Sequence, residues 1–336
     1  MTQHSIRGSR TQYSRIRLEE LNKRLRSLSE VTTIPDLTIF AAGSYGRLEA
    51  SEYSDIDVFF LTPKSRTSIA DLNTARLRLF GKVIEIADQM GFPKFSNDCE
   101  YLVVLHTDDI LQNLGGRTDD YENHFTARML LLLESYCLYG QNSFDEVLEK
   151  SIASYFKDYP DHKETFQPLF LLNDIGRFWK TLLLNYENKR AMKRLSPEDP
   201  ETQSKRTRHK VRNFKLKYSR MTTCFASIAA LGSHGAPVTE SQVVAMTKLT
   251  PQARLESIAD RVPSAKTAVG EVLDRYEWFL EMTGHSTAEL ESHFADKQKR
   301  TDMFASANAY GDAMFRLLLA IDDANPNLKL LRNLVI

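Results

Sequence analysis

The chain has 336 residues, of which 42% are hydrophobic and 26% charged, a composition typical of a globular protein long enough to form two domains. Its 44 basic residues balance its 44 acidic residues, so net charge alone gives no reason to expect a nucleic-acid or membrane partner. Three separated cysteines give neither a disulfide framework nor a zinc site, and no apolar run is long enough for a signal or membrane segment, so we expect a cytoplasmic protein.

The first hundred residues alternate between helical and strand-like patterns. Apolar residues at helical spacing predict an amphipathic helix over residues 13–30. Short β-prone runs predict strands at residues 37–42, 58–61 and 101–106, and residues 69–90 predict a helix that ends before Gly-Phe-Pro. This alternation indicates a small domain of mixed helix and strand.

From residue 119 onward no convincing strand pattern is present, and the chain is expected to be helical. Helical patterns cover residues 124–139, 166–189, 210–231, 240–248, 262–283, 288–299 and 303–322. Residues 197–202 contain two prolines and favour a flexible loop between helices.

The expected fold class is therefore α+β, with a small mixed sheet followed by an all-α helical bundle. We expect an N-terminal helix in residues 1–36 that packs on the sheet domain, the sheet domain itself in residues 37–118, and the bundle in residues 119–336.

Two aspartates lie at the mouth of the second predicted strand, in the stretch 38-TIFAAGSYGRLEASEYSDIDVFFLT-62. Asp55 and Asp57 are two residues apart, so on a strand both carboxylates point to the same face. Like charges that close raise each other's proton affinity unless a cation lies between them. Carboxylate oxygens suit Mg²⁺, which completes its coordination with water and substrate phosphates. The pair therefore predicts a metal site.

A glycine and a serine form a turn between the first predicted strand and a helix-like segment. Backbone N–H groups at Gly43 and Ser44, together with the serine hydroxyl, can meet a phosphate at such a position. The turn and the aspartates fit one ligand, a nucleoside triphosphate with its metal. Arg47 could contact a phosphate, or it could instead pair with Glu49 or Asp55.

These residues carry a family resemblance. Gly-Ser-Tyr-Gly-Arg-Leu-Glu at 43–49, followed by Ser-Asp-Ile-Asp at 54–57, resembles the G-S-x-G-R-x-E…S-D-x-D signature of nucleotidyltransferases in the DNA polymerase β superfamily. The resemblance is closest to the branch with the PII-protein uridylyltransferases, and the leucine-rich helix that ends before a glycine, here residues 127–140, also resembles that branch.

The resemblance extends over roughly residues 37–142 and implies two-metal nucleotidyl transfer. In this interpretation Gly43 and Ser44 hold the triphosphate, and Asp55 and Asp57 hold Mg²⁺ or Mn²⁺.

The superfamily's third carboxylate lies on a later strand, and the resemblance implies an equivalent here. Glu100 is the first candidate, as both catalytic residue and metal ligand, because it shares strand parity with Leu102 and Val104. Asp98 is the substitute, and both could instead be surface residues at the start of a strand.

The helical half offers four further candidates for nucleotide contacts. Arg177 and Lys180 lie on a polar helix stripe and could contact triphosphate or base, or Arg177 could simply pair with Asp174. A lysine and a serine contact the phosphate tail in several superfamily members, which makes Lys215 and Ser219 candidates by resemblance. Lys217 or Arg220 could serve instead, or the segment could be merely solvated.

Basic residues concentrate between residues 189 and 220, where twelve Lys and Arg stand against three acids. Such a segment could attract an RNA backbone, although a solvated flexible segment is the alternative. No aromatic residue is interleaved in residues 204–210, which disfavours a base-stacking platform.

The sequence thus predicts an enzyme that moves NMP from an NTP to a hydroxyl on a protein, an RNA end or a small molecule, releasing pyrophosphate. The alternative is a catalytically inactive nucleotide-sensing or RNA-binding protein with the same fold. The acceptor, the preferred base and the oligomeric state stay open.

Overall fold

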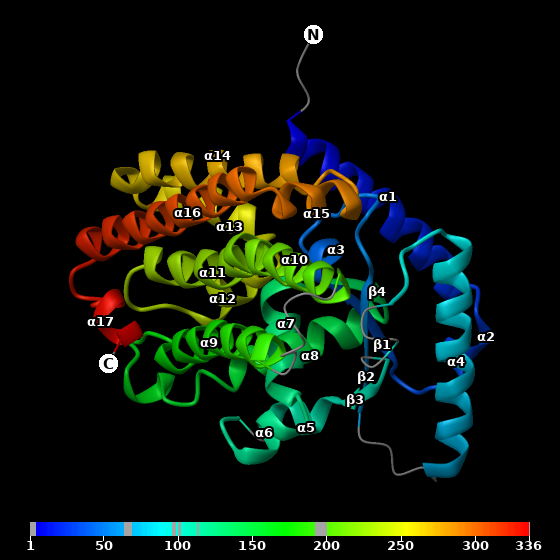
Figure 1. Ribbon diagram of the computed structural model, residues 1–336. Helices are drawn as coiled ribbons and strands as arrows, with labels where there is room; N and C mark the ends of the chain where they lie inside the picture. Colours follow the sequence, from blue (N-terminus) through cyan, green and yellow to red (C-terminus); the bar gives the residue numbers. More distant parts are fainter. Residues whose placement is uncertain are drawn as a thin grey trace. The chain divides into compact units, whose positions relative to one another are not determined.

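The computed structural model describes residues 5–63, 69–95, 99, 102–112, 114–191 and 200–335. The chain divides into two compact units, Met1–Lys157 and Asp158–Ile336. The first contains a small mixed sheet with helices, and among its described residues the second contains only helices (Figure 1). The predicted α+β fold class is therefore confirmed.

The sheet of the first unit has four strands in the order β3-β2-β1-β4. Strand β1 is antiparallel to both of its neighbours, while β2 and β3 run parallel. All five residues of β1 are buried, as expected for a central strand that is covered on both faces. The strands are β1 (Thr38–Ala42), β2 (Asp57–Thr62), β3 (Val104–His106) and β4 (Tyr136–Tyr139).

The fourth strand corrects the prediction that no strand lies beyond residue 119. Residues 124–139 were expected to form one helix, but α7 (His124–Glu134) ends at Ser135, whose backbone is extended. The chain then pairs with β1, where Cys137 lies opposite Phe40. Four residues directly after a leucine-rich helix are too few to break its periodicity. Because β4 belongs to the sheet, the sheet unit continues past residue 118 and ends at Lys157.

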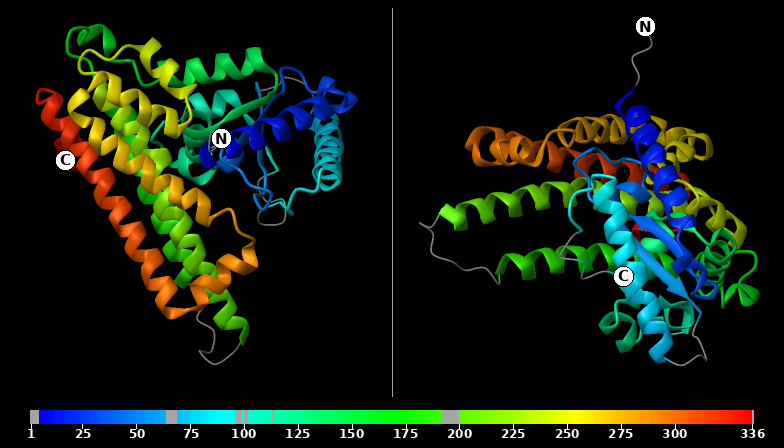
Figure 2. Two further views of the ribbon diagram at one scale, coloured as in Figure 1. Left: turned by 90° about the horizontal axis from the view of Figure 1, so that it is seen from above. Right: turned by 90° about the vertical axis from the view of Figure 1, so that its right-hand side faces the viewer.

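One face of the sheet packs against two helices that precede β1 in the sequence and one helix that follows β2. Helices α1 (Ile6–Arg26), α2 (Ser29–Thr32) and α4 (Ile69–Gln89) contribute to this core, and the right-hand view of Figure 2 shows α4 in front of the strands. The core combines Ile39, Ala41, Val58 and Phe60 of the sheet with Leu18, Leu21, Leu25, Leu79 and Val83 of the helices. The apolar spacing that predicted two amphipathic helices thus corresponds to this buried face.

The opposite face of the sheet is covered in part by α8 (Gln141–Ala153), a helix that the sequence patterns did not predict. Phe40 stacks on Phe59 with ring centroids 5.2 Å apart and also contacts Phe144 of α8. Asp57 has the same strand parity as Phe59 and therefore lies at the end of this face. The two short helices between β3 and α7 are α5 (Thr107–Gln112) and α6 (Arg117–Tyr121).

The second unit is a bundle in which the long helices run side by side, as the left-hand view of Figure 2 shows for α11 and α16. Its α-helices are α9 (Leu169–Ala191), α10 (Pro200–Lys215), α11 (Met221–Ser233), α12 (Glu240–Thr247), α13 (Pro251–Arg261), α14 (Lys266–Met282), α15 (Thr287–Ala295), α16 (Lys297–Ala324) and α17 (Leu330–Val335). Helix α13 was not predicted. Within the described residues, every helix of the chain is too short or too polar to cross a membrane.

Helices α10 and α11 are continuous through η3 (Leu216–Arg220), a π-helical segment. The loop predicted at residues 197–202 falls partly outside the described residues, and its last three residues belong to α10. Tyr218 of η3 anchors the aromatic core, since its ring stacks on Phe279 and Tyr310 with centroids 4.7 and 4.5 Å away.

A histidine at the end of α11 makes the stability of the second unit depend on pH. Burial, and secondarily the positive charge of Arg261, lower the pKa of His234 from its ordinary 6.5 to about 4. The unfolded chain binds a proton near pH 6.5 while the folded chain resists it, so the folded state is destabilised as pH falls from 6.5 to 4. We expect His234→Gln to remove this part of the decline in unfolding free energy.

Equilibrium urea unfolding at several pH values between 7 and 4 measures this effect. His285→Gln, at an exposed histidine, is the matched control and should keep the wild-type decline. A parallel loss of stability in wild type and His234→Gln across this window would contradict the assignment.

Candidate functional site

The turn after β1 lies directly against the second aspartate. Strand β1 ends at Ala42, which is paired with Asp57 across the sheet. The next residue, Gly43, has φ +66°, and a Cβ atom placed there would lie 2.7 Å from Oδ2 of Asp57. Only glycine combines this backbone conformation with so close an approach. The structure therefore brings the glycine turn and one predicted metal ligand together.

The helix after β1 is shorter than the sequence indicated. The helix-like segment was expected to cover residues 45–50, but α3 spans only Gly43–Gly46, and Leu48 then adopts φ 57°. Within residues 41–50, Ser44 is the one side chain that is not buried. Ser44 is therefore partly exposed beside Gly43, which is compatible with a phosphate contact.

The two aspartates stand at the entrance to β2, and only one of them belongs to the strand. Asp57 is its first residue and Asp55 precedes it, which differs from the expectation that both lie on the strand. Burial nevertheless alternates through residues 55–60, with the odd-numbered side chains half-buried and the even-numbered ones buried. This alternation supports placing both carboxylates on the same, accessible side.

The two candidates for the third carboxylate, Glu100 and Asp98, lie outside the described residues. Leu102 and Val104 pack against the core formed with α1 and α4, on the face opposite to Asp57. Among the described residues, no three or more His, Cys, Asp or Glu side chains gather as a metal site.

Helix α1 holds the segment between the glycine turn and the aspartates. The Thr11 hydroxyl donates a hydrogen bond to the Leu48 carbonyl (3.2 Å), and the Arg10 guanidinium donates to the Glu49 carbonyl (3.4 Å). The buried Ser14 hydroxyl accepts from the Ala50 amide (2.9 Å). The polar positions of this helix therefore position the loop, a role that its amphipathic pattern alone did not reveal.

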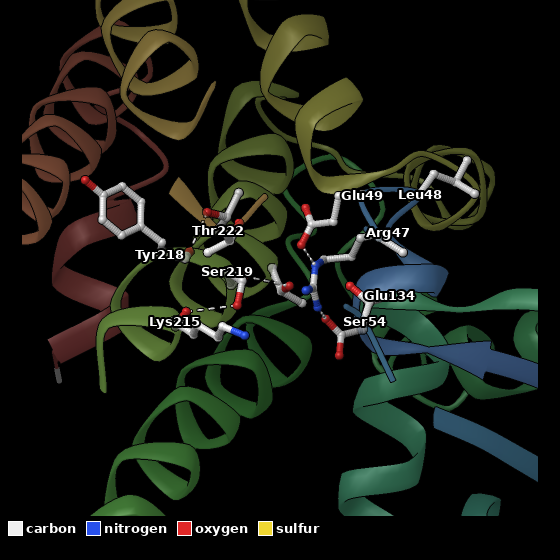
Figure 3. A network of polar contacts seen from close by, with 12 residues as sticks. Arg47, Leu48, Glu49, Ser54, Glu134, Lys215, Tyr218, Ser219 and Thr222 are labelled. Atoms are coloured by element: carbon white, nitrogen blue, oxygen red, sulfur yellow. Dashed lines mark hydrogen bonds and ion pairs between the residues drawn. The ribbon is translucent and has the colours of Figure 1, made fainter. Parts of the chain in front are cut away.

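Arg47 is buried and paired rather than exposed beside the turn. Its Nε donates to Glu49 at 2.6 Å and its Nη1 to Glu134 at 2.5 Å, and the three side chains are 5%, 6% and 0% exposed (Figure 3). The pairing with Glu49 is one of the alternatives that the sequence left open. Sequence reasoning missed Glu134, because no local pattern links residues 87 positions apart.

A second close contact joins the turn to the same end of α7. A Cβ atom on Gly46 would lie 1.9 Å from the Glu134 carbonyl oxygen, so the two backbones touch. Together with the ion pair of Arg47, this contact fixes the glycine turn on α7.

The polar stripe of α9 contains the ion pair between Arg177 and Asp174 that the sequence offered as the alternative to a nucleotide contact. Nε of Arg177 lies 3.4 Å from the buried carboxylate of Asp174. The Asn173 side chain donates to the Leu169 carbonyl of the same helix (3.0 Å), and Lys180 is exposed. Arg177 and Lys180 thus lie in the second unit without a geometry that assigns them a ligand.

Lys215 directly precedes the π-helical segment η3, and Ser219 lies within it. Lys215 ends α10 and is exposed, whereas Ser219 is 9% exposed and its hydroxyl donates to the Lys215 carbonyl at 2.9 Å (Figure 3). π-Helical turns often mark functional sites, and nothing in the residue pattern predicted this one. The Ser219 hydroxyl thus donates its hydrogen bond to the backbone of its own helix.

The segment that contains the glycine turn and the aspartates is similar to a known family of domains. Neither a curated protein nor a solved structure matches the chain. Residues 18–102 match the family model described as nucleotidyltransferase domain, and this segment includes the glycine turn, both aspartates, β1, β2 and α4. The sheet unit of this chain therefore contains a segment similar to nucleotidyltransferase domains.

Proposed function

We propose that the protein is a metal-dependent nucleotidyltransferase that moves NMP from an NTP to a hydroxyl acceptor and releases pyrophosphate. The observation that carries this proposal is the contact between the Gly43 turn and the Asp57 carboxylate, inside the segment that matches the nucleotidyltransferase domain. A phosphate held at the turn would lie next to a carboxylate suited to its counter-cation.

The residues present fit a divalent cation in part. Asp55 and Asp57 supply hard oxygen donors and are half-buried, hence accessible. In the proposal both ligate Mg²⁺ or Mn²⁺, with Glu100 or Asp98 as the third carboxylate. The metal would supply charge neutralisation at the phosphates and a lowered proton affinity of the attacking hydroxyl. Gly43 and Ser44 would orient the triphosphate through backbone N–H groups and the Ser44 hydroxyl.

Other residues receive supporting roles in the proposal. Arg47 is a positioning residue that fixes the turn, because its guanidinium is engaged by Glu49 and Glu134. We also propose that Arg177 and Lys180, on the polar stripe of α9, contact triphosphate or base, and, from the resemblance, that Lys215 and Ser219 contact the phosphate tail. We further propose that the protein is cytoplasmic and is similar to the PII-protein uridylyltransferases. Its acceptor is proposed to be a protein, an RNA end or a small molecule, and the experiment below identifies both the acceptor class and the transferred base.

Incubation of the pure protein with each α-labelled NTP, Mg²⁺ or Mn²⁺, and cell extract tests the function. We expect label to appear in one class of acceptor, and Asp55→Asn and Asp57→Asn to reduce it to background. Asp88→Asn, at an exposed aspartate of α4, is the matched control and should label like wild type.

Label transfer by the Asp55 and Asp57 variants at the wild-type rate would reject the catalytic role. Nucleotide binding without any transfer would instead favour the alternative, a nucleotide-sensing protein of the same fold, which the intact glycine turn and aspartate pair make less attractive.

A further inference from the structure

Helix α10 presents an almost uninterrupted basic surface. Val211 and Phe214 turn one side of the helix into the core of the second unit, with Tyr218 of η3 continuing that side. The remaining arc is polar, and Glu201 is the one acid in residues 200–220. The cations on this arc are Lys205, Arg206, Arg208, Lys210, Arg212 and Lys215, and Lys217 of η3 follows them with a hydrogen bond to Asn308.

Three of these cations lack an acidic counterpart among the described residues. In the described part of the chain, no ion pair joins Arg206, Lys210 or Arg212 to a carboxylate, and the Arg208 pair is with Glu291 at 3.2 Å. Arg300 of α16 adds to the same positive field, and its Nη1 donates to the Phe294 carbonyl at 3.1 Å. Burial, then Arg300 and Arg206, lower the pKa of the Lys210 ammonium.

This arrangement places like charges within one helical turn of each other. Like charges four residues apart, such as Arg206 and Lys210, repel each other on a helix. An anionic partner that lies along the helix would remove the repulsion. The basic arc from Lys205 to Lys217 extends for about 18 Å, which is too long for one phosphate group and matches a polyanion.

The character of the arc identifies the kind of polyanion. Protein interfaces usually centre on apolar or aromatic anchors, and membrane-surface helices use an exposed apolar face, whereas the apolar side of α10 is already buried by Val211 and Phe214. Phosphate backbones need only suitably placed cations. Contacts to phosphates carry no base information, so binding through this arc is expected to be independent of sequence.

We propose that the exposed face of α10 binds the phosphate backbone of RNA without sequence preference. The choice of RNA over DNA rests on the proposed function, because an RNA end, with its vicinal hydroxyls, is among the acceptors of nucleotidyl transfer. Binding itself is independent of turnover and is measured without it.

Fluorescence anisotropy of a labelled RNA hairpin with a single-stranded 3′ tail tests the proposal, with the full chain carrying Asp57→Asn. The test variant adds Arg206→Gln, Lys210→Gln and Arg212→Gln. The control removes three exposed lysines elsewhere, through Lys157→Gln, Lys163→Gln and Lys266→Gln. We expect only the test variant to bind more weakly, by about tenfold or more. The negative slope of log affinity against log salt should become shallower by about 2 to 3 in this variant.

Three results would overturn the proposal. They are no RNA binding by the parent chain, equal affinity and salt slope in the test and control variants, and displacement of RNA by polyglutamate at matched charge, which would indicate an acidic protein partner. Equal affinity for a DNA hairpin of the same sequence would overturn the assignment to RNA. Since no turnover is needed, none of these results bears on the label-transfer experiment, and failure of label transfer leaves the binding result intact.

Discussion

Replacing Gly43 with alanine is expected to lower nucleotidyl transfer by about a hundredfold or more while leaving the protein folded. A methyl group at this position would lie 2.7 Å from Oδ2 of Asp57, so the carboxylate must move. Because that atom is the end of a side chain, it can move at little cost to the fold. The positive φ adds a strain of about 1–2 kcal/mol. The change therefore acts on the position of the aspartate more than on stability.

Gly91 provides a matched control for this prediction. It has φ +70°, close to the +66° of Gly43, but nothing lies within 4 Å of the Cβ that alanine would add. Gly91→Ala should lose a similar amount of unfolding free energy and keep wild-type transfer. Label transfer and urea unfolding, measured on both variants, separate the two effects. Equal activity in the two variants would mean that the contact with Asp57 has no role in catalysis.

The glycine turn and the aspartates could be predicted because their information is local. Gly43, Ser44, Asp55 and Asp57 lie within fifteen consecutive residues, and a strand on either side fixes how they meet. The antiparallel pairing of β1 and β2 places the residue before the turn opposite Asp57, so the hairpin-like connection itself creates the contact. Apolar runs of strand and helix length were sufficient to indicate both strands and the helices that pack on them.

What could not be predicted depends on residues far apart in the chain. Strand β4 is recognisable only through its pairing with β1, since its four residues continue an apolar helical run. The engagement of Arg47 by Glu134, and the contact of Gly46 with the same residue's carbonyl, likewise join positions almost ninety residues apart. The face on which an apolar position lies is likewise not fixed by the sequence when both faces of a sheet are covered, as Leu102 and Val104 show by packing on the side of α1 and α4.

Arg47→Met is expected to lower the free energy of unfolding by about 3–5 kcal/mol, the cost of leaving buried charge without its partner. Glu49 and Glu134 have side chains only 6% and 0% exposed, so water cannot replace the guanidinium. Urea unfolding followed by circular dichroism reports on both units. Tryptophan fluorescence reports on the second, because Trp179 and Trp278 both lie there. The dichroism midpoint should therefore fall more than the fluorescence midpoint.

Two further variants show whether Arg47 acts through structure or through nucleotide. Glu134→Gln should also destabilise the first unit, although Glu134 has no proposed contact with nucleotide. Lys150→Met breaks an ion pair with Glu146 that is 60% and 62% exposed and should cost no more than about 1 kcal/mol. If Arg47→Met were no more destabilising than Lys150→Met but weakened NTP binding strongly, the arginine would be a nucleotide ligand. The buried pairing argues for the opposite result, in which the fold loses stability and the folded fraction keeps its nucleotide affinity.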